Sequence, residues 1–371
     1  MNVDQARAYA PLFDPVRLKI ARELKGLKKT ELARRVGVTA AALTQYETGA
    51  SRPSAGALLK LSLALGQSVE FFAQDGRRSA LPVHGKAFFR SLRSTRQGQR
   101  DRAEAHVMLV SEIVDELSRR VKLPPLNIPD NLHVSDADTR ETIEQNAEAL
   151  RAYWSMQAGP VPNMVRLLEA NGIVVIHCLM DCRDVDAFSR WFKDRPLVVL
   201  NADNEHVDRL RFDAAHELGH IVMHADPEPG SGILESQAHM FAAAFLMPRN
   251  VIKNQLPTRL FWPVFRELKQ TWGVSVQALL RRALDLGRLT EATYRRAMMT
   301  LSKLNQRKNE TMFPLEGNEP SVLLRMAVEV LEAKGYTIND LASDTRLPEP
   351  FVREAVFSDV DTRPSVELSP T

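Results

Sequence analysis

The chain has 371 residues and 44% hydrophobic content, which is enough apolar material for two or more domains with buried cores. The formal net charge is only +3, but the first 125 residues carry a clear excess of Lys and Arg, which favours an anionic partner such as nucleic acid. Two cysteines, Cys178 and Cys182, argue against a disulfide-built secreted scaffold. There is no signal-like N-terminus and no apolar run of the roughly 18 residues that a membrane span needs, so we expect a soluble, cytoplasmic protein with no membrane partner.

The first 75 residues have the pattern of short helices separated by glycine turns. We expect one helix over Val16 to Lys25, because its apolar residues recur every four positions. Thr30 can cap a second helix from Glu31 to Val36, which Gly37 ends in a tight bend. A third helix follows from Thr39 to about Thr48, capped by its first residue. Two short helices joined by a glycine turn form a unit with which many proteins read DNA.

A family resemblance covers most of residues 14 to 74. It lies in the run Thr-Glu-Leu-Ala-Arg-Arg-Val-Gly-Val-Thr-Ala-Ala-Ala-Leu-Thr-Gln-Tyr-Glu-Thr-Gly, which begins at Thr30, and in the Ser-Arg-Pro-Ser that follows from Ser51. This stretch closely resembles the lambda-repressor-like (XRE) helix-turn-helix family. The resemblance implies that residues 39 to 48 form the recognition helix and that the partner is a double-stranded DNA operator.

The recognition helix offers a small set of side chains for base contacts. Gln45 can make a paired hydrogen bond to adenine, whereas alanines offer only contact with thymine methyls. The groove-facing candidates are Thr39, Ala40, Ala41, Thr44 and Gln45. The candidates for phosphate contacts, which position a protein without reading sequence, are Lys28, Lys29, Arg34, Arg35 and Arg52. For each of these basic residues a solvated helix face is the alternative, and a protein-binding role is the alternative for the whole unit.

A basic connector follows the predicted DNA-reading unit. From Arg77 to Arg102 there are eight Lys or Arg residues against a single acidic residue, with Phe88 and Phe89 in the middle. Such a run either extends the DNA footprint or forms a solvated surface. Ala103 to Lys122 then has the period of an amphipathic helix, which ends at a Leu-Pro-Pro sequence. A helix bounded in this way can pack two copies together, so we expect a homodimer.

The middle of the chain mixes helical and strand patterns. We expect helices from about Thr139 to Gln157 and from Pro162 to Ala170, then three short strands at Ile173 to His177, Ala187 to Phe192 and Leu197 to Leu200. The last of these strands, extended to Asn201, either presents an edge to an extended peptide or packs as core. Longer helices follow at about Asp208 to His224 and Leu234 to Leu246.

The first of these longer helices carries His216, Glu217 and His220 in the spacing His-Glu-x-x-His. Residues four apart lie one turn apart on the same helix face, so both imidazoles can meet one zinc ion while Glu217 projects toward a water on the metal. This is the arrangement of metal-assisted peptide hydrolysis. A helix that happens to carry two histidines is the alternative.

The third metal ligand has three candidates, His224, Glu235 and His239. His224 lies two turns from His216, about 12 Å along the helix at 1.5 Å per residue, which favours an outer-shell or exposed position. Glu235 opens the following helix and can reach back toward the metal. His239 lies one turn later on that helix, so the two residues can exchange roles.

A second resemblance joins these two motifs. Arg-Phe-x-x-Ala-His-Glu-Leu-Gly-His, which begins at Arg211, and Glu-Ser-Gln-Ala-His-Met-Phe-Ala-Ala-Ala-Phe-Leu-Met-Pro, which begins at Glu235, look like the ImmA/IrrE family of metallopeptidases. The resemblance spans about residues 172 to 252. It implies Zn²⁺ as cofactor, His216, His220 and Glu235 as ligands, and Glu217 as general base. The family often has Asn where this chain has His239, which keeps His239 as the alternative ligand.

The remaining sequence is helical. We expect helices at Phe261 to Thr271, Ser275 to Leu286, Thr290 to Leu304, Pro320 to Lys334, Ile338 to Ala342 and Pro348 to Val356, with disorder beyond about Asp361. His177, Cys178 and Cys182 are conceivable as a second metal site, but ordinary thiols are the preferred interpretation.

The predicted fold class is multidomain, with an all-α helix-turn-helix domain, an α+β zincin-like metallopeptidase domain with a small sheet, and a helical C-terminal region. The predicted domains are a DNA-binding domain at 1–75, a basic connector and helical linker at 76–130, a peptidase domain at 131–252, its helical extension at 253–310, and a small helical domain with a disordered tail at 311–371.

Two functions fit this organisation. The first is a DNA-binding transcriptional regulator with a zinc endopeptidase domain that cleaves itself, a second copy or a partner repressor. In two-gene relatives, as the resemblance implies, the peptidase cleaves a separate helix-turn-helix repressor. The second is a non-catalytic transcription factor whose metal-binding domain senses a small molecule or protein partner.

Overall fold

The computed structural model describes residues 3–73, 88–89, 97–178, 186–203, 206–224, 231–307 and 310–357. The chain folds into two compact units, each built from segments that are separate in the sequence. The first unit comprises Met1–Val83, Ser94–Leu123 and Val322–Thr371, and the second comprises His84–Arg93 and Pro124–Ser321. Most of the basic connector, Cys182 and the tail beyond 357 lie outside the described residues. The expected domain boundaries therefore stay predictions.

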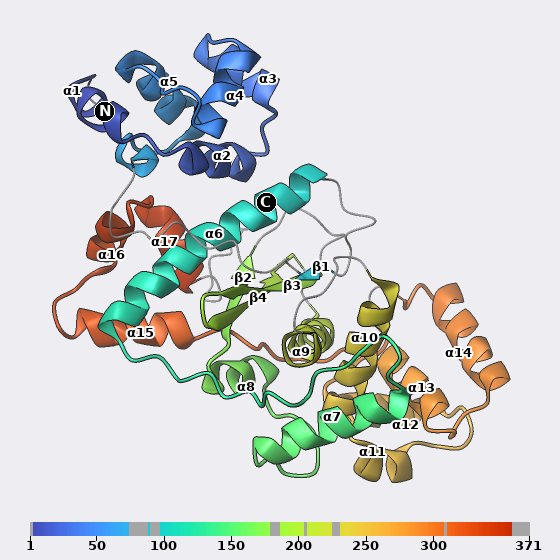
Figure 1. Cartoon of the computed structure of the whole chain (residues 1–371). Coiled ribbons are helices and arrows are strands. Elements are labelled where there is room, and N and C mark those ends of the chain that lie inside the picture. Colours follow the sequence, from blue (N-terminus) through green and yellow to red (C-terminus); the bar gives the residue numbers. More distant parts are fainter. Residues whose placement is uncertain are drawn as a thin grey trace, which may run out of the picture. The chain divides into compact units, whose positions relative to one another are not determined.

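The N-terminal part of the first unit is entirely helical, as Figure 1 shows in blue. Its elements are α1 (Val3–Tyr9), the 3-10 helix η1 (Ala10–Leu12), α2 (Pro15–Leu24), α3 (Lys29–Val36), α4 (Ala40–Thr48), α5 (Ala55–Leu65) and the 3-10 helix η2 (Glu70–Phe72). The predicted glycine bend between α3 and α4 is present, because Gly37 has a φ of 74°, a left-handed conformation that glycine adopts without strain.

The capping predictions had mixed outcomes. Thr39 caps α4 as expected, with its hydroxyl accepting a 3.1 Å hydrogen bond from the backbone N–H of Ala42. The prediction that Thr30 caps α3 was wrong. This helix begins at Lys29, so Thr30 lies inside the first turn, and Lys28 occupies the cap position without a side-chain hydrogen bond. A hydroxyl inside the first turn is not in position to accept hydrogen bonds from the unpaired backbone N–H groups at the start of the helix.

A buried carboxylate fixes α4 against its neighbours. The side chain of Glu47 is 3% exposed, and it forms ion pairs with Arg22 of α2 at 2.5 Å and with Lys29 of α3 at 3.3 Å. An ion pair with this little solvent is costly to break, because removal of one partner leaves an uncompensated buried charge. The orientation of α4 is therefore set by α2 and α3 together.

The long helix α6 (Gln97–Arg120) completes the first unit with three C-terminal helices, α15 (Leu323–Glu332), α16 (Ile338–Thr345) and α17 (Glu349–Phe357). It contacts α2, α15, α16 and α17, and Arg120 pairs with Asp344 of α16 at 2.5 Å. Val107, Val110 and Ile113 on its apolar face are fully buried by the chain itself. This face is thus not available for a second copy, and the homodimer stays a prediction.

Among the described residues of the second unit, four strands form one sheet in the order β1-β3-β4-β2. They are β1 (Phe88–Phe89), β2 (Val174–Cys178), β3 (Ala187–Phe192) and β4 (Arg195–Asn201), with β2 parallel to β4 and β3 antiparallel to both β1 and β4. Of the two interpretations of residues 197 to 201, the core strand is confirmed and the peptide-binding edge was wrong. Strand β4 is hydrogen-bonded on both sides, and Val198, Val199 and Leu200 are at most 1% exposed.

Helices cover this sheet and extend away from it. They are α7 (Arg140–Tyr153), α8 (Met164–Ala170), α9 (Val207–Met223), α10 (Gly232–Leu246), α11 (Arg249–Gln255), α12 (Trp262–Trp272), α13 (Val276–Asp285) and α14 (Glu291–Lys303). Helix α9 packs on β3 and β4, α8 packs on β2, and α10 packs on α9 and α7, so α8 and α9 lie below the sheet in Figure 1. A single hydrophobic core runs through these elements.

The predicted fold class is confirmed, with a helical DNA-binding part, a small sheet with helices in the middle, and a helical C-terminal region. Within the described ranges, no helix combines the length and the apolar character that crossing a bilayer demands.

The histidine of α6 gives the first unit a testable pH dependence. His106 lies against Phe351 of α17, with ring centroids 5.0 Å apart, and burial together with the charge of Arg102 lowers the pKa of His106 to about 4. Its unfolded pKa is about 6.5. The neutral form is therefore favoured by folding, and stability that is complete above about pH 6.5 is lost as the pH falls toward 4. The loss amounts to about 2 kcal/mol at pH 5.

We expect hydrogen exchange of α6 amides, corrected for the intrinsic effect of pH, to show less protection at pH 5 than at pH 7 in the wild type. The His106→Leu variant should show a much smaller pH effect, because leucine has no side-chain group that can bind a proton. An equal loss of protection in both proteins would contradict this assignment.

Candidate metal centre and DNA-reading helix

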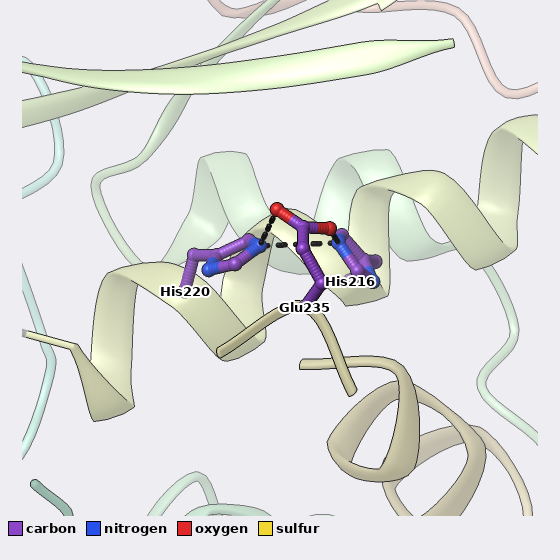
Figure 2. Close-up of side chains that lie close together, drawn as sticks. All are labelled: His216, His220 and Glu235. Carbon is purple, nitrogen blue, oxygen red and sulfur yellow. Dashed lines mark hydrogen bonds and ion pairs between the residues drawn. The ribbon is translucent and has the colours of Figure 1, made fainter. Parts of the chain in front are cut away.

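The helix α9 places two imidazoles on one face. His216 and His220 are one turn apart, and each is 1% exposed. Their Nε2 atoms lie 3.1 Å apart and face the same point, as Figure 2 shows. Two buried imidazoles with converging nitrogens are a costly arrangement unless a proton or a metal ion lies between them.

Glu235 enters this point from α10. Its Oε2 atom lies 3.3 Å from Nε2 of His216, and its Oε1 atom lies 3.5 Å from Nε2 of His220 (Figure 2). Two ligands of a tetrahedral zinc ion with bonds of about 2.0–2.1 Å lie about 3.3 Å apart. The spacing of the two imidazole nitrogens and the Glu235 carboxylate therefore fits such an ion, and these three residues would leave a position for a water or a substrate.

No other group of three His, Cys, Asp or Glu residues with this convergence occurs in the described part of the chain. The second metal site considered around His177 and Cys178 is thus not formed by the described residues, and its third member, Cys182, lies outside them.

The charge of Glu235 suits the same role. Burial raises the pKa of Glu235, but its contacts with His216 and His220 outweigh burial and lower the pKa below its usual range. Glu235 is consequently ionised at neutral pH, which is the state in which a carboxylate binds a metal.

His239, the alternative ligand, lies away from this cluster. Its ring packs on Phe212 with centroids 4.7 Å apart, its centroid is 6.2 Å from that of His216, and its side chain is exposed. The geometry therefore favours Glu235 over His239 as the third ligand.

Glu217 is held by a contact that the spacing of the motif does not reveal. The carboxylate is 1% exposed, and its Oε2 atom accepts a 2.6 Å hydrogen bond from the hydroxyl of Ser189 on β3. Ser189 was missed in the sequence, because only the packing of α9 on the sheet brings it to Glu217. A hydroxyl donor stabilises the ionised carboxylate and fixes its orientation.

The approach of α10 to α9 depends on a residue without a side chain. A Cβ atom at Gly219 would lie 3.1 Å from the ring of Phe241 and 3.3 Å from the backbone of Ala238, so a side chain there would require Phe241 and α10 to give way by a few tenths of an ångström. Gly219 lies between the two histidines of α9. The same close contact therefore brings Glu235 to His216 and His220.

His224, which was expected to be outer-shell or exposed, is buried and touches His220. Its exposed fraction is 4%, and its Nδ1 atom lies 3.0 Å from Nδ1 of His220. Burial and the neighbouring His220 lower the pKa of His224 to about 4, so this imidazole is neutral at neutral pH.

Helix α4, the predicted recognition helix, presents its candidate DNA-contacting side chains to solvent. Ala40, Ala41, Thr44 and Gln45 are all exposed, as is Thr39 at the cap. Among the predicted phosphate contacts, Lys28 and Arg34 are exposed, Lys29 pairs with Glu47, Arg35 pairs with Glu31, and Arg52 donates to the carbonyl of Pro11 at 2.8 Å. Lys28 and Arg34 are thus the most available cations of the set.

Two family models match the chain. Residues 18–72 match a helix-turn-helix model, and residues 168–284 match a peptidase family model described as the IrrE N-terminal-like domain. A search of curated proteins found no match. The chain therefore joins an XRE-type helix-turn-helix domain to an IrrE/ImmA-like peptidase domain. It is a DNA-binding regulator that carries a domain of a peptidase family.

The choice between Glu235 and His239 can be tested with zinc itself. We expect wild type to retain about one zinc per chain after dialysis. Glu235→Gln should weaken zinc binding by more than the roughly 10- to 100-fold that loss of an outer-shell partner costs. His239→Gln should bind zinc as wild type does, because its ring lies on Phe212. Competition with a chromophoric chelator gives the affinities, and the opposite order of the two variants would make His239 the ligand.

Proposed function

We propose that this chain is a transcriptional regulator whose second unit is a zinc-dependent endopeptidase. The observation that carries the proposal is the convergence of His216, His220 and Glu235 within 4.8 Å, beside the buried carboxylate of Glu217. In this proposal the first three residues are the metal ligands and Glu217 is the general base.

The roles follow from the positions of the residues. His216, His220 and Glu235 would hold the zinc ion, which would supply Lewis-acid polarisation of the scissile carbonyl. Glu217 accepts a proton from the attacking water and returns it to the leaving amine. Ser189 holds Glu217 by its hydrogen bond, and the carboxylate is buried from solvent. Exclusion of water strengthens each of these electrostatic interactions.

The proposed substrate is an extended segment that adds to β3. This strand carries Ser189, the partner of Glu217, so a strand paired with β3 passes beside the proposed base. Main-chain pairing of this kind is a common mode of peptide recognition. In the structure, β1 of the same chain pairs there in antiparallel register, with Phe88 opposite Ser189.

The pairing of β1 favours self-cleavage. Residues 88–89 lie in the basic connector, between the helix-turn-helix domain and α6. Cleavage near this strand would cut the covalent link between the DNA reader and the rest of the chain, which is a direct way to change transcription. A second copy of the connector, or the corresponding segment of a partner repressor, can present the same kind of strand.

Peptidase activity is tested by removing the proposed base alone. Glu217→Gln should keep its zinc, because Glu217 is not among the converging ligands. Its cleavage rate should fall by roughly 10²- to 10⁴-fold, the usual contribution of a general base. Intact mass spectrometry of zinc-loaded protein over time detects the fragments and locates the cut.

A mixture of wild type with isotope-labelled Glu217→Gln protein distinguishes the two routes of cleavage. Cuts in the labelled chain show action between copies, and cuts in the unlabelled chain alone show action within one copy. Equal mass profiles for wild type and Glu217→Gln, with the chain alone and with a candidate repressor, would leave the metal-sensing function as the better account.

DNA recognition by α4 is tested with an operator selected from a random DNA library by the wild-type protein. We expect Gln45→Ala to weaken binding to this operator by about 1–3 kcal/mol while its affinity for unrelated DNA changes little, since Gln45 offers a base contact. Lys28→Ala is the matched control and should weaken both kinds of DNA alike, because a phosphate contact reads no sequence. Fluorescence anisotropy at fixed salt measures both. An unchanged operator preference in Gln45→Ala would remove this residue from the proposed reading set.

A further inference from the structure

A line of polar side chains runs from His220 away from the proposed metal position. Nδ1 of His220 lies 3.0 Å from Nδ1 of His224, and Nε2 of His224 lies 3.1 Å from the Oε1 atom of Gln237. The Nε2 atom of Gln237 then donates a 2.8 Å hydrogen bond to the backbone carbonyl of Ser135. The exposed fractions of His220, His224 and Gln237 are 1%, 4% and 2%.

The direction of each hydrogen bond in this line follows from its last member. A carbonyl oxygen can only accept, so the amide group of Gln237 must turn its NH₂ toward Ser135 and its oxygen toward His224. That oxygen requires a proton on Nε2 of His224. With Nε2 protonated, neutral His224 has a lone pair on Nδ1, which accepts a hydrogen bond from the Nδ1–H of His220. His220 is left with a lone pair on Nε2, the atom that faces Glu235 and His216.

The carbonyl at the end of the line is itself fixed in place. The backbone N–H of Ser135 donates to Asp138 at 2.6 Å, and the N–H of Val134 donates to the carbonyl of Met223 on α9 at 3.1 Å. Asn146 of α7 donates to the carbonyl of Leu132 at 2.9 Å. The short segment 132–138, which precedes α7, is thus fastened to both α9 and α7.

We propose that His224 and Gln237 are positioning residues that fix the Nδ1–H tautomer of His220 and so direct its Nε2 lone pair to the metal. The proposal rests on the proposed metal function of His220. Through these hydrogen bonds, a backbone carbonyl in a fixed position sets the orientation of the His220 ring. Outer-shell partners of this kind also raise the basicity of the ligating nitrogen.

The experiment compares zinc affinity, measured against a chromophoric chelator, in a series of full-length variants. His224→Phe keeps a ring in the same place but cannot accept the hydrogen bond from His220, so we expect zinc affinity to fall by roughly 10- to 100-fold. His224→Asn offers an acceptor oxygen near the position of Nδ1 and should recover much of this loss. Gln237→Met removes only the partner of His224 and should cause a smaller loss. His133→Phe is the control, because it makes the same substitution at an exposed histidine of the fastened segment and should leave affinity unchanged.

A second measurement does not depend on zinc affinity. Long-range ¹H–¹⁵N correlation spectra of the apo protein report which imidazole nitrogen carries the proton. We expect His220 in the Nδ1–H form and His224 in the Nε2–H form in wild type, and loss of the single His220 tautomer in His224→Phe. Circular dichroism and apo thermal unfolding identify any variant that fails to fold, and the wild-type spectrum tests the proposal even then.

The outcomes separate the two proposals. An Nε2–H form of His220 in wild type, or equal zinc affinity of His224→Phe and His133→Phe, would overturn the positioning role. Wild type that binds no zinc but shows the expected tautomers would instead overturn the metal function, while the hydrogen-bonded line would stand.

Discussion

Helices α9 and α10 pack in close contact at Gly219, and this contact places Glu235 next to His216 and His220. Gly219 has no side chain where Phe241 and the backbone of Ala238 press against α9, and this lets α10 approach closely enough for Glu235 to reach both histidines. The same contact brings Gln237 to His224. A single packing distance between two helices therefore sets the spacing of three donor atoms and the hydrogen-bonded line behind one of them.

The sheet contributes the other half of the arrangement. Helix α9 lies on β3 and β4, so Ser189 meets the carboxylate of Glu217 on the face of the helix turned toward the sheet. On the side away from β4, β3 pairs with β1. Glu217, the proposed base, thus contacts Ser189, and Ser189 lies opposite β1 of the connector. The proposed peptidase site is therefore next to the segment that follows the DNA-binding domain. The proposed self-cleavage would need no separate repressor to relay the signal.

The sequence was most informative where the relation between residues is local. The spacing of His216 and His220 is one helical turn, and Thr39 acts on a backbone group three residues away, so helix geometry alone predicted both relations. The run Leu-Val-Val-Leu at 197–200 was ambiguous between an edge and a core strand. Its lack of alternation is in fact typical of a strand buried on both faces, and β4 lies in the middle of the sheet. Ser189, Gln237 and Ser135 could not be found in this way, because their partners are distant in sequence and meet them only after the helices pack.

The proposed function requires His216, His220 and Glu235 to hold one zinc ion together. A crystal structure of zinc-loaded wild-type protein, with anomalous diffraction recorded on both sides of the zinc edge, would locate this ion. We predict one anomalous peak with two imidazole nitrogens and a Glu235 oxygen at about 2.0–2.2 Å. A peak coordinated by His239 or by a thiolate, or an absence of any peak between α9 and α10, would contradict it.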